Sequence, residues 1–220
     1  MLLNLEKASK SPKNTEPQMI KAIIFDFGRV ISAQKPASLF SSYENDLGLE
    51  PGTINSIMFN SKAWEDALIG SKTVEEFWQE IAPQLNLNTP TEIDAFRSRY
   101  HSDEAINHSV VDLMQRLHGR RKLAVLSNSP PGLAQWLADW NLLHLFDTVF
   151  CSGDEGVVKP EPTAFDITLQ RLEIGPEEAV FIDDTMEHVE ASRKMGLQAI
   201  LFTTAEALAE ELADLLREDF

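Results

Sequence analysis

Residues 23–31 read IIFDFGRVI, an apolar run that Asp26 and Gly28 interrupt. Short runs rich in isoleucine and phenylalanine favour buried β-strands, so we expect a strand over residues 22–27. Helical patterns separate four further apolar runs, at residues 123–127, 148–151, 179–182 and 198–202. Because parallel strands need a crossover helix between them, this order predicts a parallel sheet.

The helical patterns between the apolar runs indicate which class of fold the parallel sheet belongs to. Val110, Met114 and Leu117 share one helix face before the second run, and Leu208 and Leu212 do so near the carboxyl end. Helices on both faces of a parallel sheet give an open, doubly wound, Rossmann-like α/β fold. Such sheets bind ligands at the carboxyl ends of their strands.

Residues 35–105 form too long a segment for a simple connection, since elements of an α/β domain are normally joined by a handful of residues. The segment repeats apolar residues at helical spacing, contains no strand pattern, and is divided by glycines and prolines into short helices. We therefore expect a small helical cap domain over residues 35–105, inserted after the first strand. The α/β core domain would comprise residues 19–34 and 106–220.

Composition excludes several classes of partner. A net charge of −16 repels nucleic acid and acidic lipid, and no basic stripe offsets it locally. No apolar stretch reaches the length of about 18 residues that a membrane span needs, and the polar residues 1–18 predict a disordered extension. The single Cys151, in an apolar run, is expected to be a buried strand residue. We expect a cytoplasmic protein, either a monomer or a homodimer.

Polar residues follow four of the expected strands, where each strand ends. They are Asp26, Ser127 and Asn128, Lys159, and Asp183 and Asp184. Each aspartate alone is explained as a helix cap or turn residue. Carboxyl ends of parallel strands meet at one edge of a sheet, however, so we expect the whole set to converge. Clustered carboxylates suit Mg²⁺, whereas a hydroxyl and an ammonium group can hold phosphate oxygens.

Four blocks of the sequence resemble the motifs of the haloacid dehalogenase-like superfamily, in the order that the family has them. IIFDFGRVI resembles the first motif, VLSNS the second, VVKPEPTAF the third and FIDDTMEHVEASRKMGLQAI the fourth. One such motif is a weak signal, but an ordered set of four covers nearly the whole folded chain. The resemblance implies a magnesium-dependent hydrolase of small phosphorylated substrates.

The resemblance also implies a role for each matching residue. Asp26 would attack phosphorus to form an aspartyl-phosphate. The magnesium ion would bind Asp26, the main-chain carbonyl of Gly28 and Asp184, while Asp183 would hold a metal-bound water.

Three further residues would serve the phosphoryl group. Ser127 would donate to one of its oxygens, and Lys159 would neutralise both that group and the crowded carboxylates. Asn128 either contacts the substrate or braces its loop.

The sequence departs from the family pattern at Gly28, where the family places a second aspartate as general acid and base. The FDFG and FIDD forms together resemble a subgroup that includes bacterial α-glucose-1-phosphatases and the amino-terminal phosphatase domain of soluble epoxide hydrolases. That likeness favours sugar phosphates as substrates. Arg29 could contact phosphate or pair with a nearby acid. His188 could hydrogen-bond a metal ligand, tune the magnesium ion or carry the proton.

Two other functions compete with the phosphatase interpretation. A haloacid dehalogenase attacks carbon, needs no metal and has no use for the Asp183–Asp184 pair. A weakly catalytic protein that binds phosphorylated ligands for regulation could retain the phosphate site without the general acid. The joint presence of Asp26, Ser127 and Lys159 favours the enzyme. In the expected cap, the turn at residues 70–72 lies where related caps present their substrate loop, whereas the neighbouring aromatic residues fit a cap core equally well.

Overall fold

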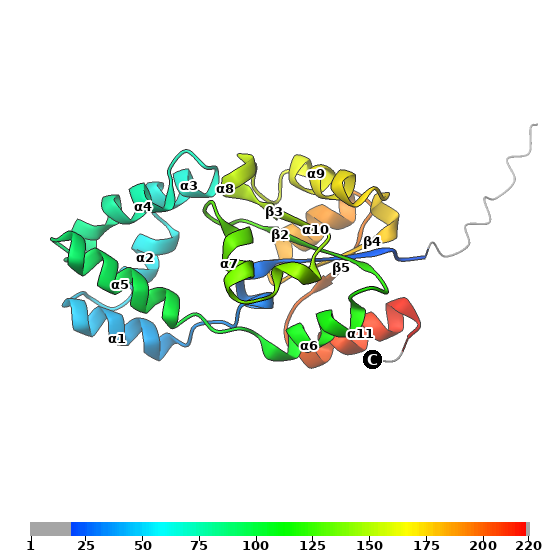
Figure 1. Cartoon of the computed structure of the whole chain (residues 1–220), viewed down its shortest axis with the longest axis horizontal. Helices are drawn as coiled ribbons and strands as arrows, with labels where there is room; N and C mark the ends of the chain where they lie inside the picture. Colours follow the sequence, from blue (N-terminus) through cyan, green and yellow to red (C-terminus); the bar gives the residue numbers. More distant parts are fainter. Residues whose placement is uncertain (1–18, 219–220) are drawn as a thin grey trace, which may run out of the picture.

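The computed structural model describes residues 19–218 and shows a five-stranded parallel sheet in the order β3-β2-β1-β4-β5 (Figure 1). The strands are β1 (Ala22–Phe25), β2 (Lys122–Ser127), β3 (Thr148–Cys151), β4 (Ala179–Asp183) and β5 (Gln198–Leu201). The chain moves outward from β1 in one direction with β2 and β3, and in the other with β4 and β5. The order therefore reverses between β1 and β4, which is where doubly wound sheets open a crevice for ligands.

The predicted strands are confirmed to within two residues at each end. The largest difference is at β1, which ends at Phe25 instead of residue 27. The next residues form a short helical turn, η1 (Phe27–Ile31), that contains the non-helical Gly28 and Arg29. Cys151 ends β3 and is 2% exposed, as expected of a buried strand residue.

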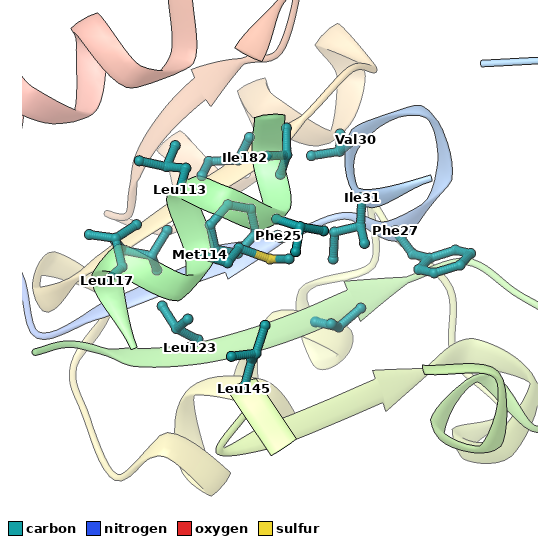
Figure 2. Packing of buried hydrophobic residues seen from close by; sticks show 14 of the residues in the cluster. Phe25, Phe27, Val30, Ile31, Leu113, Met114, Leu117, Leu123, Leu145 and Ile182 are labelled. Carbon is teal, nitrogen blue, oxygen red and sulfur yellow. The ribbon is translucent and has the colours of Figure 1, made fainter. Parts of the chain in front are cut away.

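Alternate residues of each strand enter two separate hydrophobic clusters, one on each face of the sheet. Ile23 and Phe25 join the cluster beneath α6 (His108–Leu117), α7 (Leu133–Asp139) and α11 (Ala205–Leu216). Figure 2 shows Phe25 against Met114 and other side chains of this cluster. Full burial of one such side chain stabilises the fold by about 1.5–3 kcal/mol relative to exposure.

The second cluster lies on the opposite face. There Ile24 and Phe181 pack with Phe165 of α9 (Pro162–Leu172), and Ala191 of α10 (Met186–Lys194) lies beside them. In Figure 1, α9 lies above the sheet, whereas α6 and α11 lie below it. Burial on both faces explains why the strands are continuous apolar runs.

The segment between β1 and α6 folds into a helical insert with its own hydrophobic cluster. It contains α1 (Ala37–Leu47), α2 (Thr53–Phe59), α3 (Lys62–Leu68), α4 (Val74–Ile81), η2 (Ala82–Leu85) and α5 (Pro90–Ser102). Aromatic rings dominate its interior: Tyr43 packs edge-on against Phe96, with ring centroids 5.5 Å apart. Capping boxes at Thr73 and Thr89 begin α4 and α5. The helical content that we predicted for this segment is confirmed.

Two adjacent linkers join the insert to the sheet, at the bottom of Figure 1. They pair antiparallel, with Ser32 opposite Ile106, and Ala33 N–H donates to the carbonyl of Ala105 at 2.7 Å. Lys35 and Glu104 add an ion pair between largely buried side chains. The paired linkers run close to the expected domain boundaries at 34–35 and 105–106, which stay a prediction.

The remaining short elements are α8 (Ser152–Glu155), η3 (Leu143–Leu145) and η4 (Pro176–Glu178). Across residues 19–218, no helix has both the length and the apolar character that a membrane crossing needs. The predicted disordered extension over residues 1–18 lies outside the described residues.

Candidate active site

Asp26 lies at the carboxyl end of β1, next to the point where the strand order reverses. Its N–H donates to the carbonyl of Ile182 at 2.8 Å, so the pairing of β1 with β4 continues through this residue. The next residue, Phe27, points into the hydrophobic cluster under α7, where its ring centroid lies 5.4 Å from that of Trp136 and 5.5 Å from that of Trp140. With Phe27 anchored in the core, Asp26 is held at the edge of the sheet and is 8% exposed.

Asp183, the last residue of β4, is fully buried, and its carboxylate takes part in three hydrogen bonds. Its Oδ1 accepts from the N–H of Thr185 at 2.8 Å. Its Oδ2 accepts from Lys159 Nζ at 2.6 Å and lies 3.0 Å from His188 Nδ1. The sequence left three roles open for His188, and the structure places it as a hydrogen-bonding partner of Asp183.

Lys159 joins the two strands through its side chain. Its Nζ donates to Asp26 Oδ1 at 2.7 Å as well as to Asp183, and the residue is only 3% exposed. Asn128 fixes the backbone at this point: its Oδ1 accepts from Lys159 N–H at 2.7 Å, and its Nδ2 donates to the Lys159 carbonyl at 2.9 Å. Asn128 thus braces the loop in this structure, which is one of the two roles that the sequence allowed.

Charges in this buried cluster shift one another's pKa values. Burial raises the pKa of Asp26, and the ammonium of Lys159 opposes that rise. Burial acts in the same direction on Asp183, but the hydrogen bond from His188 and the charge of Lys159 hold its pKa below the usual range. Burial would lower the pKa of Lys159, yet the two carboxylates raise it. Lys159 therefore remains a cation between two acids.

Asp184 follows β4 and completes a group of three carboxylates with Asp26 and Asp183; one oxygen from each lies within 4.8 Å of the other two. Burial raises the pKa of Asp184, and the guanidinium of Arg29 opposes the rise. An all-oxygen donor set of closely spaced carboxylates fits a hard divalent cation such as Mg²⁺. Asp183 has the least remaining capacity for a metal, because both of its oxygens already accept hydrogen bonds.

Arg29 pairs with an acid in this structure, which is one of the two alternatives that the sequence left open. Its Nε lies 2.7 Å from Asp184 Oδ2, while 58% of its side chain is exposed. The residue has a left-handed backbone with φ of 60°, and its N–H donates to Ser32 Oγ at 3.2 Å. Non-glycine residues rarely adopt this conformation, which here turns the side chain toward Asp184.

The backbone conformation at residue 28 does not require a glycine. Its φ is −65°, and a Cβ added there would meet only Asp26 Oδ2, at 3.9 Å. The backbone at residue 28 would therefore accept a Cβ atom without strain.

The side chains predicted from the sequence do gather at this edge of the sheet. Lys159 directly connects Asp26 and Asp183, and Asp184 lies beside them. Ser127, which is 3% exposed, ends β2 at the same edge. Sequence reasoning missed Thr185, whose main-chain N–H orients Asp183; its position at the start of α10 was the available signal.

Comparison with known proteins agrees with this geometry. The family model described as haloacid dehalogenase-like hydrolase matches residues 19–196. The sesquiterpene phosphatase astK of Aspergillus oryzae is 25% identical over 89% of this chain and 96% of its own length. The fructose-1-phosphate phosphatase YqaB of Escherichia coli is 33% identical, over 41% of this chain and 49% of its own. The chain spans only 37% and 19% of two other curated relatives.

A solved structure shares the fold. It is the wild-type form of a haloacid dehalogenase family enzyme from Bacteroides thetaiotaomicron, in complex with magnesium and inorganic phosphate. The TM-score is 0.65 at 20% identity, and the match covers 84% of this chain and 94% of the other.

Replacing Lys159 by methionine should destabilise the protein, because two buried carboxylates would lose their shared cation. Breaking a buried charge pair from one side costs about 3–5 kcal/mol. We expect a loss of that size in the free energy of unfolding, measured by urea denaturation near neutral pH. Lys21→Met is the matched control: Lys21 is 52% exposed and pairs with Glu178, and such surface pairs contribute about 0–1 kcal/mol.

Acidification should reduce the loss in the free energy of unfolding that Lys159→Met causes. In the variant, burial without a cation leaves the pKa of both carboxyls above the unfolded value of about 4. A carboxyl group whose pKa is higher in the folded than in the unfolded state lowers the free energy of unfolding as the pH rises toward the folded-state pKa. Below the unfolded-state pKa the group has no such effect on stability. In the wild type, the lowered pKa of Asp183 gives stability that acid removes. A loss that grows on acidification would contradict the role assigned to Lys159.

Proposed function

The chain belongs to the haloacid dehalogenase-like hydrolase family, and from that membership we propose that it is a magnesium-dependent phosphatase of small phosphomonoesters. The observation that carries the proposal is the position of Asp26: its carboxylate is paired with the buried Lys159 and lies within 4.8 Å of two further carboxylates. This is a nucleophile held beside a candidate cation site. The named phosphatase activities of the two curated relatives support it.

The chemistry follows from the placement of the charges. Asp26 would attack phosphorus and form an aspartyl-phosphate as the P–O ester bond breaks; the leaving oxygen would depart with the bonding electrons and take its proton from water, and a second water would then hydrolyse the aspartyl-phosphate to inorganic phosphate. Lys159 would balance the negative charge on Asp26 and on the incoming phosphoryl group, and Ser127 would donate to a phosphoryl oxygen. Asp26, Asp184 and the carbonyl of Gly28 would hold Mg²⁺, with Asp183 in support. The ion would lower the electrostatic repulsion between phosphate and the carboxylates.

Sugar phosphates are the substrate class that we propose. The support is the likeness of the FDFG and FIDD segments to sugar-phosphate phosphatases, together with the partial match to fructose-1-phosphate phosphatase. The sesquiterpene phosphatase covers more of the chain, so a substrate panel should include prenyl phosphates as well.

Asp26→Asn tests the proposed function itself. A neutral amide cannot form an acyl phosphate, so turnover of every phosphomonoester that the wild type hydrolyses should fall to background. The measurement is phosphate release with and without Mg²⁺, after circular dichroism has confirmed the fold. Asp166→Asn, an exposed change on α9 with the same loss of charge, should retain full activity. Undiminished turnover by Asp26→Asn would exclude the mechanism.

Magnesium dependence gives a second prediction. Asp184→Asn should weaken Mg²⁺ binding and phosphatase activity together, because it removes one carboxylate from the donor set. Isothermal titration calorimetry measures the first quantity, and steady-state kinetics measures the second. Chelator should silence the wild type reversibly, and Ca²⁺ should replace Mg²⁺ poorly because its coordination is looser. Full phosphatase activity in excess chelator would contradict the magnesium dependence.

Gly28 makes a third prediction, about the leaving group. Without an acid to protonate the departing oxygen, that oxygen must bear more negative charge in the transition state. The wild type should therefore hydrolyse aryl phosphates and sugar 1-phosphates faster than primary alkyl phosphates such as sugar 6-phosphates. A plot of log kcat/KM against leaving-group pKa should be steep.

Gly28→Asp should flatten that plot, since it supplies a carboxylic acid at a position whose backbone accepts a Cβ. The gain should be greatest for alkyl esters and reach at most about 10²–10⁴, the usual range for general acid catalysis. Gly28→Asn is the matched control, because it has nearly the same shape and cannot donate a carboxylic proton. A shallow slope in the wild type would show that another residue already donates the proton.

A further inference from the structure

The three clustered carboxylates have two cationic side chains beside them, and these differ in how firmly they are held. Lys159 is 3% exposed, and its ammonium bonds both Asp26 and Asp183. The side chain of Arg29 is 58% exposed, and in the described part of the chain its guanidinium has a single ion-pair partner, the carboxylate of Asp184. Of the two cations, only Arg29 can therefore leave its carboxylate without breaking a buried network.

The backbone that carries Arg29 is fixed, whereas its side chain has room to move. Arg29 N–H donates to Ser32 Oγ at 3.2 Å, and Ser32 N–H donates to the carbonyl of Phe27 at 2.9 Å. Phe27 and Val30, both labelled in Figure 2, are buried in the hydrophobic cluster on either side. Rotation about the side-chain bonds can thus carry the guanidinium into water. The main chain of the turn, including the carbonyl of Gly28, stays in place.

Asp184 is at once the partner of Arg29 and a member of the candidate cation site. Its Oδ2 lies 2.7 Å from Arg29 Nε, and its Oδ1 accepts from Thr185 Oγ1 at 3.3 Å. Mg²⁺ requires short ligand bonds of about 2.0–2.1 Å in a nearly ideal octahedron, and it carries twice the charge of a guanidinium. An ion on this carboxylate would repel a guanidinium in contact with the same group. Magnesium binding and the Arg29–Asp184 pair therefore oppose each other.

The charges of the site show what an exchange between the two cations would achieve. When ionised, Asp26, Asp183 and Asp184 carry three negative charges, of which the ammonium of Lys159 balances one. Arg29 balances a second. A magnesium ion carries enough charge to balance both that remain after Lys159, so the guanidinium is no longer needed at Asp184 once the ion is bound. Arg29 thus does for Asp184, at lower charge, what the ion would do.

We propose that Arg29 is the resident counter-cation of Asp184, and that Mg²⁺ must displace it in order to bind. The exchange lowers the affinity of the site for magnesium, so Arg29 sets the Mg²⁺ concentration at which the site fills. Arg29 acts through Asp184 and is a positioning residue. This inference rests on the magnesium site of the proposed function, but it does not depend on which phosphate ester the protein hydrolyses.

Arg29→Gln tests the effect on affinity, because glutamine stays polar, lacks the charge and bears the same cost at positive φ. Isothermal titration calorimetry should show the Kd for Mg²⁺ falling by about fivefold. A mostly exposed ion pair contributes up to about 1 kcal/mol, which corresponds to that factor. Arg171→Gln is the matched control: Arg171, near the carboxyl end of α9, also lies 2.7 Å from its partner, Glu155. It removes the same charge and should leave the Kd at the wild-type value.

Displacement itself can be followed in the ¹H–¹⁵N signal of Arg29 Nε in wild-type protein. The signal is assigned by its loss in Arg29→Gln or in Arg29→Lys. After treatment with chelator, the ion pair should slow exchange of the Nε proton with water. Titration with Mg²⁺ should shift the signal and bring the exchange rate up to that of an unpaired arginine, whereas the signal of Arg171 should stay where it is. Because the titration uses wild-type protein, it tests the exchange even if Arg29→Gln folds poorly.

Two results would overturn the inference while leaving the proposed function intact. The first is a wild type that binds Mg²⁺ together with a folded Arg29→Gln variant that binds it no more tightly. The second is an Arg29 Nε signal that Mg²⁺ leaves unchanged although calorimetry shows the ion bound. If neither wild type nor Arg29→Gln binds Mg²⁺, the inference fails together with the magnesium dependence of the proposed function.

Discussion

The ammonium of Lys159, buried between the carboxylates of Asp26 and Asp183, is the interaction on which the site depends. Removing charged groups from water costs several kcal/mol for each ion, and only close pairing with further hydrogen bonds offsets that cost. The pairing requires β1, β4 and the loop before α9 to meet at one point. A parallel sheet whose strand order reverses between β1 and β4 brings them there, so the fold and the charge cluster require each other.

The sequence predicted this convergence because it follows from two local signals. Apolar runs mark buried parallel strands, and polar residues at their carboxyl ends must then share an edge. Contacts that depend on distant backbone geometry could not be predicted in this way. Asn128 bonds a backbone 31 residues away, and Arg29, whose φ is 60°, pairs with Asp184 from a different strand end. The start of α5 had a local signal that the sequence reasoning missed, because Thr89 and Glu92 have the spacing of the capping box that they form in the structure.

The helical insert has a different relation to the sequence. Its helices follow from apolar spacing, whereas its contact with the core joins residues that are distant in the sequence: a Cβ on Gly70 would lie 2.2 Å from the carbonyl oxygen of Gly153, 83 residues further along the chain. The charged groups of the Gly70 turn pair within the insert. The buried cation Lys159 belongs to the core.

Phosphorylation of Asp26 during turnover can be measured directly. The enzyme is mixed with a good aryl phosphate substrate, quenched rapidly in acid, digested with a protease and analysed by mass spectrometry. If Asp26 is the nucleophile, the peptide that contains it should carry a phosphoryl group during turnover and lose it once the substrate is exhausted. Steady turnover without any phosphorylated peptide, or a phosphoryl group on another residue such as His188, would exclude Asp26 as the nucleophile.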